Sequence, residues 1–298
     1  MSKNIEFNHI NTQVFQLIED LDVAGNVTKP RGFQCKGANL ATLDIDPLFP
    51  IMDFEVRPFN YKYFAGELAW YFKASPNIDF INNFSSFWKN ICDDNKANSN
   101  YGNLMFNGAG GIDGHGVNQL EWVYESLVID KDTRQAIAFY NQPMFQYKGN
   151  KDFVCTMYMN FFINKDHLDM KVQMRSNDIF FGLTYDAGWF ALIHQNMYMC
   201  LKKIYPELKL GMYYHCADNI HYYERHFDIV QKILDSQLRD SIKMELKKPL
   251  FDFNENGLFL TDETLNYIEK IDNILQSNDI SNSQSYWKYQ LSDLFIFS

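Results

Sequence analysis

Residues 174–189, MRSNDIFFGLTYDAGW, collect polar side chains at a point where a strand is expected to run into a helix. The polar side chains that stand out are Arg175, Ser176, Asn177, Asp178 and Asp186. The guanidinium of Arg175 is a planar fork that suits a phosphate group, and the hydroxyl of Ser176 follows directly after it. A strand end with this many polar groups is more typical of a binding site than of a core.

Cys155 lies in the stretch KDFVCTMYMNFFI, twenty residues before Arg175. Alternation along a strand would place its side chain on the face of Met157, Met159 and Phe161, where an isolated cysteine is usually a core residue. A guanidinium held close to the thiol would instead lower the thiol pKa from about 8.5, and the thiolate is the nucleophile. The two residues therefore predict a nucleophilic cysteine, provided that the fold brings them together.

The elements that would position these residues follow from the hydrophobic pattern. Helical spacing predicts helices over residues 11–21, 63–75, 186–205 and 219–238. Alternation predicts strands over residues 135–143, 153–163, 168–176 and 210–217. Residues 93–116 are rich in Asn, Gly and Asp and predict a long loop, of a kind that is often functional. Strands interleaved with helices indicate an α/β domain.

The pattern changes near residue 240, after which the chain becomes polar and helical, with a Ser/Asn-rich stretch at 277–285. We therefore divide the chain into a catalytic domain, residues 1–240, and an appended helical C-terminal tail, residues 241–298. The sequence assigns no role to this tail.

Composition restricts the class of protein and of ligand. The chain has 298 residues, of which 46% are hydrophobic, enough for a substantial core. Its formal charge of −10 argues against broad binding to nucleic acid or to a membrane surface, so the expected ligand is small. No apolar run reaches the roughly 18 residues of a membrane span, and MSKNIEFNHI lacks a signal-peptide core, so a cytoplasmic location is expected. Five widely spaced cysteines predict reduced thiols and neither disulfides nor a metal site.

Several short motifs resemble the thymidylate synthase family in their order and spacing. They are GELAWYF, NYG, FVC, then RSND with FFGL, and finally HYYERHF. The positions that match the family signature are Cys155, Arg175, Ser176, Asp178, Gly182, Leu183, His221 and Tyr223. The resemblance covers roughly residues 30–235 and, as an ordered set, is far more specific than any one motif. It implies the thymidylate synthase-like fold, a mixed β-sheet flanked by helices, and a homodimer formed by packing sheet against sheet.

Two positions depart from the family pattern. Thr156 follows the cysteine where thymidylate synthases have a histidine, and Asp186 stands where they have an asparagine that pairs with uracil. Both changes resemble the phage deoxycytidylate hydroxymethylases. A carboxylate accepts from the N4 amino group of cytosine and, with one proton, also bridges N3, whereas an asparagine amide suits uracil. The alternative is that Asp186 only caps the helix that begins near it.

The resemblance implies a mechanism that uses 5,10-methylenetetrahydrofolate as one-carbon donor. Cys155 would add to C6 of dCMP, C5 would take the one-carbon unit, and water would capture the product as 5-hydroxymethyl-dCMP with intact tetrahydrofolate. Glu67 matches the family's catalytic glutamate, and Tyr101 of NYG matches a tyrosine that assists proton removal from C5. Without the resemblance, Glu67 would be a surface acid on a helix and Tyr101 part of a turn.

The resemblance also assigns the nucleotide contacts. Arg175 and Ser176 would hold the phosphate, the segment that contains Asn177 and Asp178 would meet the base, and His221 with Tyr223 would bind the sugar 3′-hydroxyl. On their own, His221 and Tyr223 would be structural residues at a helix start.

Two further arginines complete the predicted phosphate site. Arg134 would reach the phosphate of the partner subunit, although the second arginine of the family's pair is Gln135 here. Arg31 of KPRGF would match an early phosphate arginine of the family.

The sequence is compatible with four other functions. They are a thymidylate synthase, a deoxyuridylate hydroxymethylase, a CMP hydroxymethylase and a non-catalytic scaffold. A role in phage DNA modification would follow from hydroxymethylcytosine synthesis. The sequence does not show which residues face the sugar 2′ position or the folate.

Overall fold

A computed structural model describes residues 8–107, 118–277 and 280–298 of the chain. The helices within these residues are α1 (Ile10–Ala24), α2 (Tyr61–Phe72), α3 (Trp88–Ile91), α4 (Tyr101–Phe106), α5 (Gln119–Ile129), α6 (Thr184–Leu201), α7 (Phe227–Leu234), α8 (Asp262–Gln276) and α9 (Gln284–Leu291). The strands are β1 (Asn26–Thr28), β2 (Cys35–Ile45), β3 (Ile137–Phe139), β4 (Thr156–Asn164), β5 (His167–Met174), β6 (Asn177–Asp178), β7 (Lys209–Tyr223), β8 (Met244–Leu246), β9 (Phe251–Asn254), β10 (Gly257–Leu260) and β11 (Phe295–Phe297).

The main sheet of the described chain has seven strands in the order β1-β2-β7-β5-β4-β3, with β6 paired to β7 beside this path. β5 and β6 run parallel to β7, and the other neighbours are antiparallel. The sheet is therefore mixed, and it is flanked by helices, which confirms the predicted α/β fold class.

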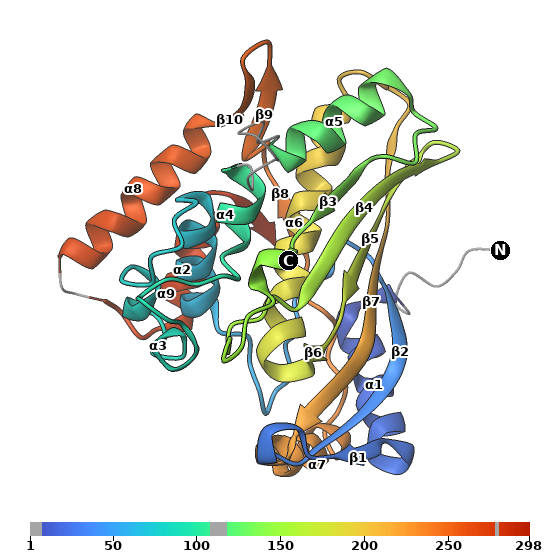
Figure 1. Cartoon of the computed structure of the whole chain (residues 1–298), viewed down its shortest axis with the longest axis vertical. Coiled ribbons are helices and arrows are strands. Elements are labelled where there is room, and N and C mark those ends of the chain that lie inside the picture. The colour runs from blue at the N-terminus through green and yellow to red at the C-terminus, as the bar shows by residue number, and fades with distance from the viewer. Residues whose placement is uncertain (1–7, 108–117, 278–279) are drawn as a thin grey trace.

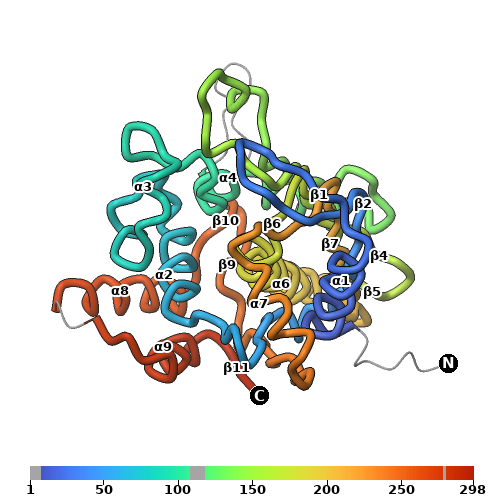
Figure 2. Tube along the Cα trace, turned by 90° about the horizontal axis from the view of Figure 1, so that it is seen from below, coloured from blue at the N-terminus to red at the C-terminus, as the bar shows by residue number. Residues whose placement is uncertain are grey.

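Helix α6 lies between the main sheet and the group of helices α2, α4, α8 and α9 (Figure 1 and Figure 2). Apolar residues surround its whole circumference, as expected for a helix that is covered on every side. Two buried amides on α6 bind backbone groups of the C-terminal segment: Gln195 donates to the carbonyl of Met244 at 2.9 Å, and Asn196 donates to that of Phe251 at 2.9 Å. Because α6 follows directly after the RSND segment, the core fixes that segment in place.

The C-terminal segment packs against α2, which carries Glu67 (Figure 1). Trp287 of α9 is fully buried, and the hydroxyl of Tyr267 on α8 donates to the carbonyl of Ala65 on α2 at 2.9 Å. Lys73 also forms an ion pair with Asp272 at 2.6 Å. The division of the chain at residue 240 stays a prediction. In the structure, residues 241–298 share a hydrophobic core with the rest of the chain, and they form short strands as well as helices.

The predicted helix over residues 219–238 is wrong in its first part. Residues 219–223 continue β7, which pairs with β2 from Ile45↔Tyr213 to Cys35↔Tyr223. The physical reason is the backbone pairing with β2, which continues beyond residue 217 to Cys35↔Tyr223, and β2 itself was not predicted. His221 and Tyr223 therefore lie on a strand, and the interpretation of both as residues at a helix start is wrong.

The predicted alternation along β4 is also interrupted. A β-bulge lies between Thr156 and Tyr158, so that side chains on either side of it point differently from a regular strand. Met159 and Phe161 are buried, whereas Cys155 precedes the strand and is partly accessible. The expectation that these three residues share one face is wrong. The predicted loop over residues 93–116 contains α4, and its residues 108–117 lie outside the described part of the chain.

Candidate active site

Cys155 and Arg175 are brought together by the pairing of β4 with β5. The first residue of β4 pairs with the last residue of β5, Thr156↔Met174, so the residue before one strand lies next to the residue after the other. The backbone N–H of Arg175 donates to the carbonyl of Cys155 at 2.9 Å, and its Nη2 lies 3.4 Å from the Cys155 Sγ. The spacing of twenty residues is thus the length of the connection between two adjacent strand ends.

The guanidinium of Arg175 is held by several contacts before any ligand binds. Its Nε donates to the carbonyl of Val154 at 3.0 Å, its Nη2 donates to the carbonyl of Phe153, and the group stacks over the Phe153 ring at 4.6 Å from the ring centre. These contacts fix the cation beside the sulfur with little freedom to rotate.

The pKa of the Cys155 thiol is nevertheless raised above its ordinary value. Burial raises it most, Arg175 opposes that effect, and the carboxylates of Asp186 and Asp152 raise it further, while Arg31 lowers it. The expectation that Arg175 would lower the thiol pKa overall is therefore wrong for the free protein, because desolvation outweighs the nearby cation. Arg31, whose positive charge lowers the thiol pKa, lies in the short turn of residues 30–32. Its backbone φ of 53° is in the left-handed region.

Glu67 is a buried acid on α2 and not a surface residue. Its side chain is only 6% exposed, and the Tyr63 hydroxyl donates to its Oε1 at 2.7 Å. Burial raises the pKa of Glu67 to about 8, the bond from Tyr63 lowers it, and the charge of Asp186 raises it. A carboxyl group in this setting carries its proton at neutral pH and can donate it.

Asp186 lies inside the first turn of α6 and does not cap a helix. The helical segment begins earlier, with a π-helical turn at Ile179–Leu183, and its cap is Asp178, whose Oδ1 accepts from the backbone N–H groups of Phe180 at 2.7 Å and Phe181 at 3.0 Å. Asp186 instead accepts at Oδ2 from Nδ2 of Asn177 at 2.8 Å. The capping explanation for Asp186 is therefore excluded by the local geometry.

The environment of Asp186 gives it a pKa near neutrality. Burial raises the pKa to about 6, and hydrogen bonds from Asn177 and Tyr101 oppose that change. The residue is only partly buried. Its charge raises the pKa of Cys155, Tyr101 and Glu67, which places the four predicted catalytic residues in one cluster.

Tyr101 begins α4 and is buried against α2. The hydroxyl of Thr156 donates to the Tyr101 hydroxyl at 2.7 Å, so the residue that replaces a histidine orients the tyrosine. Gly102 allows this position, because a Cβ there would lie 1.6 Å from the carbonyl oxygen of Tyr71 on α2. The NYG motif is therefore a close contact between two helices and not a turn.

His221 and Tyr223 extend from β7 toward the segment that follows β5. β6 pairs with β7 in the register Asp178↔His221, and the rings of His221 and Tyr223 lie edge to face at 5.1 Å. Nδ1 of His221 bonds to Oδ1 of Asn219 at 2.9 Å, and burial lowers the pKa of His221 while the charge of Asp178 raises it. The role of these two side chains in binding the sugar stays a prediction.

The remaining predicted site residues differ in their placement. Ser176 is half-buried between Arg175 and β6. Arg134 is exposed in the connection between α5 and β3, where the backbone carbonyl of Gln135 accepts from Nε1 of Trp122 at 2.7 Å. Arg134 shows no contact with the cluster around Cys155 within the described residues of one chain, so its predicted role across a dimer interface stays a prediction.

An exposed aromatic side chain between two arginines was not predicted from the sequence. The Phe181 side chain is 45% exposed, and the guanidinium groups of Arg225 and Arg57 lie 4.6 Å and 6.0 Å from its ring centre. Arg57 also donates to the carbonyl of Phe180 at 2.7 Å. The sequence shows only the pair of phenylalanines in FFGL and does not tell that Phe180 is buried and Phe181 exposed.

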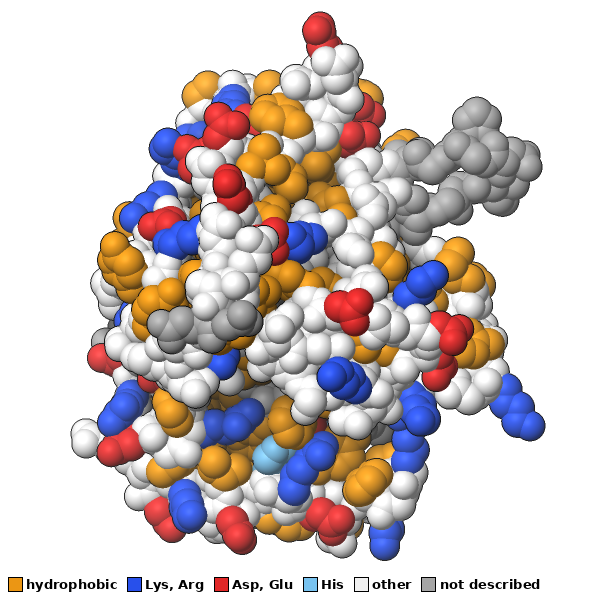
Figure 3. All heavy atoms as spheres, turned by 90° about the vertical axis from the view of Figure 1, so that its left-hand side faces the viewer, with side chains coloured by type: hydrophobic (Ala, Val, Ile, Leu, Met, Phe, Trp, Pro, Cys, Tyr) orange, Lys and Arg blue, Asp and Glu red, His pale blue; other side chains and the backbone are white. Residues whose placement is uncertain are grey.

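Figure 3 shows lysine and arginine side chains on both sides of a histidine in the lower half of the face that lies to the left in Figure 1, with acidic side chains on the same face. Neighbouring cations can attract a small anion even when the net charge of the protein is negative.

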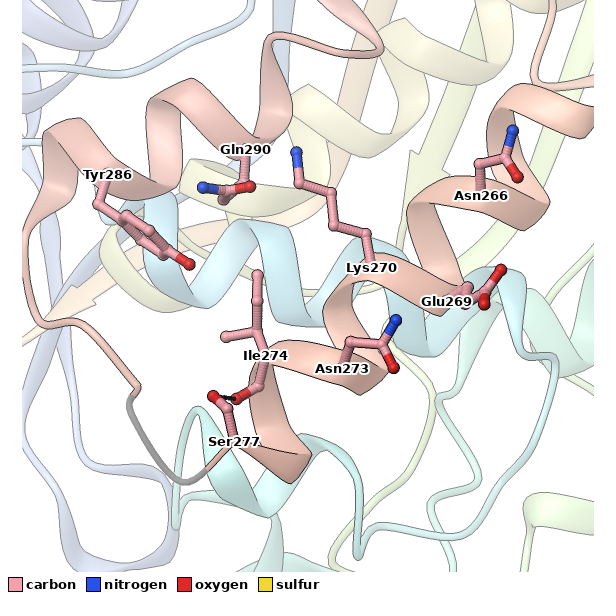
Figure 4. Close-up of a pocket in the computed structure, with 8 residues that line it drawn as sticks. All are labelled: Asn266, Glu269, Lys270, Asn273, Ile274, Ser277, Tyr286 and Gln290. Carbon is pink, nitrogen blue, oxygen red and sulfur yellow. Dashed lines mark hydrogen bonds between the residues drawn. The ribbon is translucent and has the colours of Figure 1, made fainter.

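A separate open groove lies between α8 and α9, with a volume of about 510 Å³ (Figure 4). Its lining residues are Asn266, Glu269, Lys270, Asn273, Ile274, Ser277, Tyr286 and Gln290. None of them belongs to the cluster around Cys155, so the groove and the candidate active site are different places.

The cluster combines a thiol with two carboxyl groups whose pKa values differ. At neutral pH Glu67, with a pKa of about 8, mostly carries a proton, and Asp186, with a pKa of about 6, is mostly ionised. Such a set can add sulfur to an electron-poor carbon, donate a proton and stabilise a charge that develops on the ring. The described helices include none that is long and apolar enough to cross a membrane.

Comparison with known proteins agrees with this geometry. The thymidylate synthase family model matches residues 29–271. The chain is similar to the deoxycytidylate 5-hydroxymethyltransferase of Enterobacteria phage T6, at 26% identity over 69% of this chain and 85% of that protein. It is also similar to the deoxyuridylate hydroxymethyltransferase of Bacillus phage SP01, at 28% identity over 67% of this chain and 53% of that protein. The thymidylate synthase of Mycoplasma pneumoniae is 24% identical over 74% of this chain and 83% of that protein.

Proposed function

Because this chain belongs to the thymidylate synthase family, we propose that it is a deoxycytidylate 5-hydroxymethyltransferase. It would convert dCMP, 5,10-methylenetetrahydrofolate and water to 5-hydroxymethyl-dCMP and tetrahydrofolate. That the chain is a one-carbon transferase follows from the family and from the similarity to phage hydroxymethyltransferases. The choice of cytosine is the part that needs an argument from this site.

The placement of Asp186 supports cytosine. Asp178 caps the helical segment, so capping does not account for the carboxyl group of Asp186 in the first turn of α6. Oδ2 of Asp186 accepts from Asn177, so an oxygen that accepts hydrogen bonds is fixed in the site. The N4 amino group of cytosine can donate to such an oxygen, whereas the O4 carbonyl of uracil would be repelled by it. With a pKa of about 6, Asp186 can also carry the proton that N3 of cytosine needs.

Each catalytic step can be assigned to a group of this chain. The Cys155 sulfur adds to C6 of the pyrimidine, and Asp186 stabilises the charge that this addition places on the ring at N3. Tyr101, whose hydroxyl accepts from Thr156, would assist removal of the proton from C5. Glu67, with its proton at neutral pH, orders water and exchanges protons with the departing and entering groups.

The family uses 5,10-methylenetetrahydrofolate, and the surface near the cluster fits such a group. The co-substrate supplies the one-carbon unit, and it consists of flat rings joined to a carboxylate-bearing tail. The exposed ring of Phe181 offers a surface for stacking, and Arg57 and Arg225 beside it offer cations for a carboxylate. We infer that these three residues hold the co-substrate.

The nucleotide phosphate would be held by Arg175, Ser176 and Arg31. Because Nε and Nη2 of Arg175 already bind backbone carbonyls, Nη1 is the nitrogen left for a phosphate oxygen. The segment of Asn177 and Asp178 would meet the base through Asp186, and His221 with Tyr223 would bind the sugar. Arg134 of one subunit would reach the site of the other in a homodimer, and the protein would act in the cytoplasm of a host cell.

The deciding experiment compares three nucleotides in parallel. The protein is incubated with 5,10-methylenetetrahydrofolate and dCMP, dUMP or CMP, and the products are identified by mass spectrometry. We expect dCMP to gain a hydroxymethyl group while tetrahydrofolate is released. Gain of a methyl group by dUMP would identify a thymidylate synthase, and hydroxymethylation of dUMP or CMP would identify the corresponding hydroxymethylase. The Cys155→Ser variant is the control for catalysis by this site.

A further inference from the structure

Behind Asp186 lies a chain of three buried polar side chains. The Tyr213 hydroxyl is 2.6 Å from Nδ1 of His215, Nε2 of His215 is 3.1 Å from Oδ1 of Asn177, and Nδ2 of Asn177 is 2.8 Å from Oδ2 of Asp186. The exposed fractions of Tyr213, His215 and Asn177 are 0%, 1% and 2%. Polar groups that are buried this completely cost free energy unless each of their hydrogen bonds is made. All the hydrogen bonds of this row of side chains must therefore form together.

The chemistry of the four groups gives the chain one direction when Asp186 is ionised. A carboxylate only accepts, so Asn177 must present its amide N–H groups to Asp186 and its oxygen to His215. Nε2 of His215 must then carry the hydrogen, which leaves Nδ1 as an acceptor for the Tyr213 hydroxyl. Each donor in the chain thus points toward Asp186.

The backbone is built to allow these contacts. β6 is a two-residue strand that pairs with β7 in the register Asn177↔Ile220. This pairing holds Asn177 beside β7, the strand that also carries His215. Gly182 leaves the space in which Asn177 meets Asp186, because a Cβ at this position would lie 2.7 Å from Nδ2 of Asn177 and 3.2 Å from Oδ2 of Asp186. The π-helical turn that contains Gly182 therefore has a role in this contact.

We propose that Asn177, His215 and Tyr213 are positioning residues that keep Oδ2 of Asp186 as an acceptor, so that any proton on Asp186 resides on Oδ1. This inference rests on the proposed function and deepens it. An acceptor at Oδ2 and a proton on Oδ1 form the pair that cytosine requires at N4 and N3. We call these three hydrogen-bonded side chains, Tyr213, His215 and Asn177, the relay. Without the relay either oxygen of Asp186 can carry the proton, and the carboxyl group can then also match the N3–H and O4 of uracil.

The relay works because it adds a donor without adding a charge. Burial lowers the pKa of His215 to about 3, so the imidazole stays neutral across the range in which Asp186 titrates. A cation at this place would hold Asp186 ionised at all useful pH values. The other titratable groups whose charge interacts with Asp186 are Glu67, Tyr71, Tyr101, Tyr140 and Cys155. None of these is positively charged.

The first test measures the relay without any reaction. Carboxyl-labelled aspartate and ring-labelled histidine report by NMR on the titration of Asp186 and on the tautomer of His215, with Asp186→Asn and His215→Leu as assignment variants. We expect the hydrogen of His215 on Nε2. We expect Asn177→Ala to move the Asp186 midpoint upward by about one to two pH units, since a hydrogen bond to the charged form is lost.

His215→Leu should move the Asp186 midpoint in the same direction as Asn177→Ala, because the amide of Asn177 loses the contact that orients it. The double variant should move it no further than Asn177→Ala alone. The matched control is His194→Leu, since His194 is also fully buried but bonds to the carbonyl of Leu168 at 2.7 Å. An unmoved midpoint in Asn177→Ala, additive shifts in the double variant, or a hydrogen on Nδ1 of His215 would overturn the proposal.

The second test measures selectivity with the same variants. Asn177→Ala should lower the ratio of kcat/KM for dCMP to that for dUMP, while His194→Leu should leave the ratio unchanged. If the midpoints shift as expected but dCMP is never a substrate, the relay stands and the proposed function fails. If dCMP is hydroxymethylated but the midpoints and the ratio do not move, the proposed function stands and the relay fails.

Discussion

Replacing Asp186 by asparagine changes the site at one atom while keeping its shape. The Oδ2 atom of Asp186 accepts from Nδ2 of Asn177 at 2.8 Å. Asparagine at position 186 removes the carboxylate that forces Asn177 to donate, so the Asn177 amide can turn over and accept from an NH₂ group at the position of Oδ2. In that orientation the NH₂ group opposes the N4 amino group of cytosine and pairs with O4 of uracil.

The size of the effect follows from the cost of an unpaired polar group. A buried donor left without an acceptor costs about 1–3 kcal/mol, which corresponds to roughly 5- to 150-fold in kcat/KM, and sites built on such pairing can discriminate more strongly. We therefore expect Asp186→Asn to lower kcat/KM for dCMP by at least about tenfold and to raise it for dUMP.

A second readout of the same variant comes from the thiol. The charge of Asp186 raises the pKa of Cys155, so its removal should lower that pKa. The pH dependence of alkylation of Cys155 in the absence of nucleotide should accordingly shift to lower pH in Asp186→Asn.

The assay determines kcat/KM for dCMP and dUMP at one folate concentration in the wild type and in two variants. Asp169→Asn is the matched control, because Asp169 is also a buried aspartate but accepts from the backbone N–H of Met212 at 2.8 Å, a bond that asparagine can keep. An equal loss for both nucleotides in Asp186→Asn, with an unchanged dCMP to dUMP ratio, would refute the reasoning.

Three further predictions test other parts of the structure. Cys155→Ser should abolish turnover and the covalent adduct with 5-fluoro-dCMP, while Cys92→Ser keeps most activity; near wild-type turnover in the first variant would exclude Cys155 as nucleophile. Glu67→Gln should spare dCMP binding, measured by calorimetry, but slow turnover by roughly 10²–10⁴-fold; weaker binding at unchanged turnover would make Glu67 a binding residue. Trp287→Ala should lower the free energy of unfolding in urea by about 3–5 kcal/mol, because its fully buried side chain leaves a cavity against α2; a loss below about 1 kcal/mol would show that residues 241–298 fold apart from the core.

The helices and the centre of the sheet could be predicted because their patterns are long and regular. The predicted helix over 63–75 corresponds to α2, Tyr61–Phe72, which is capped by the Asn60 side chain, and the alternation over 168–176 corresponds to β5, His167–Met174. β2 was missed because its middle is exposed, so that its alternation is weak. β7 was cut short because residues 220–222 near its end are all buried and show no alternation before the helical turns that follow, and only the pairing with β2 identifies them as a strand.

The chemistry of the site could be predicted further than its electrostatics. The types of Cys155 and Arg175 indicated what a thiol beside a guanidinium could do, but only the pairing of β4 with β5 brings the two groups to 3.4 Å. The direction of the shift in the thiol pKa could not be predicted, because it depends on how much protein surrounds the sulfur and on carboxylates from distant segments. The relay behind Asp186 was hidden for a similar reason, since His215 lies 38 residues from Asn177 on a strand that reads as ordinary core.

The charges of the site tie thiol reactivity to the state of Asp186. The carboxylate of Asp186 raises the pKa of Cys155, so the thiol stays protonated while Asp186 is ionised and the site is empty. A ligand that keeps the proton of Asp186 between the carboxyl group and N3 removes that negative charge and leaves Arg175, at 3.4 Å from the sulfur, as the dominant neighbour. We infer that the thiolate would then form beside a base that is already paired. In this mechanism selectivity and nucleophile activation would depend on the same carboxyl group, so a base that cannot share the proton of Asp186 would meet a less reactive sulfur.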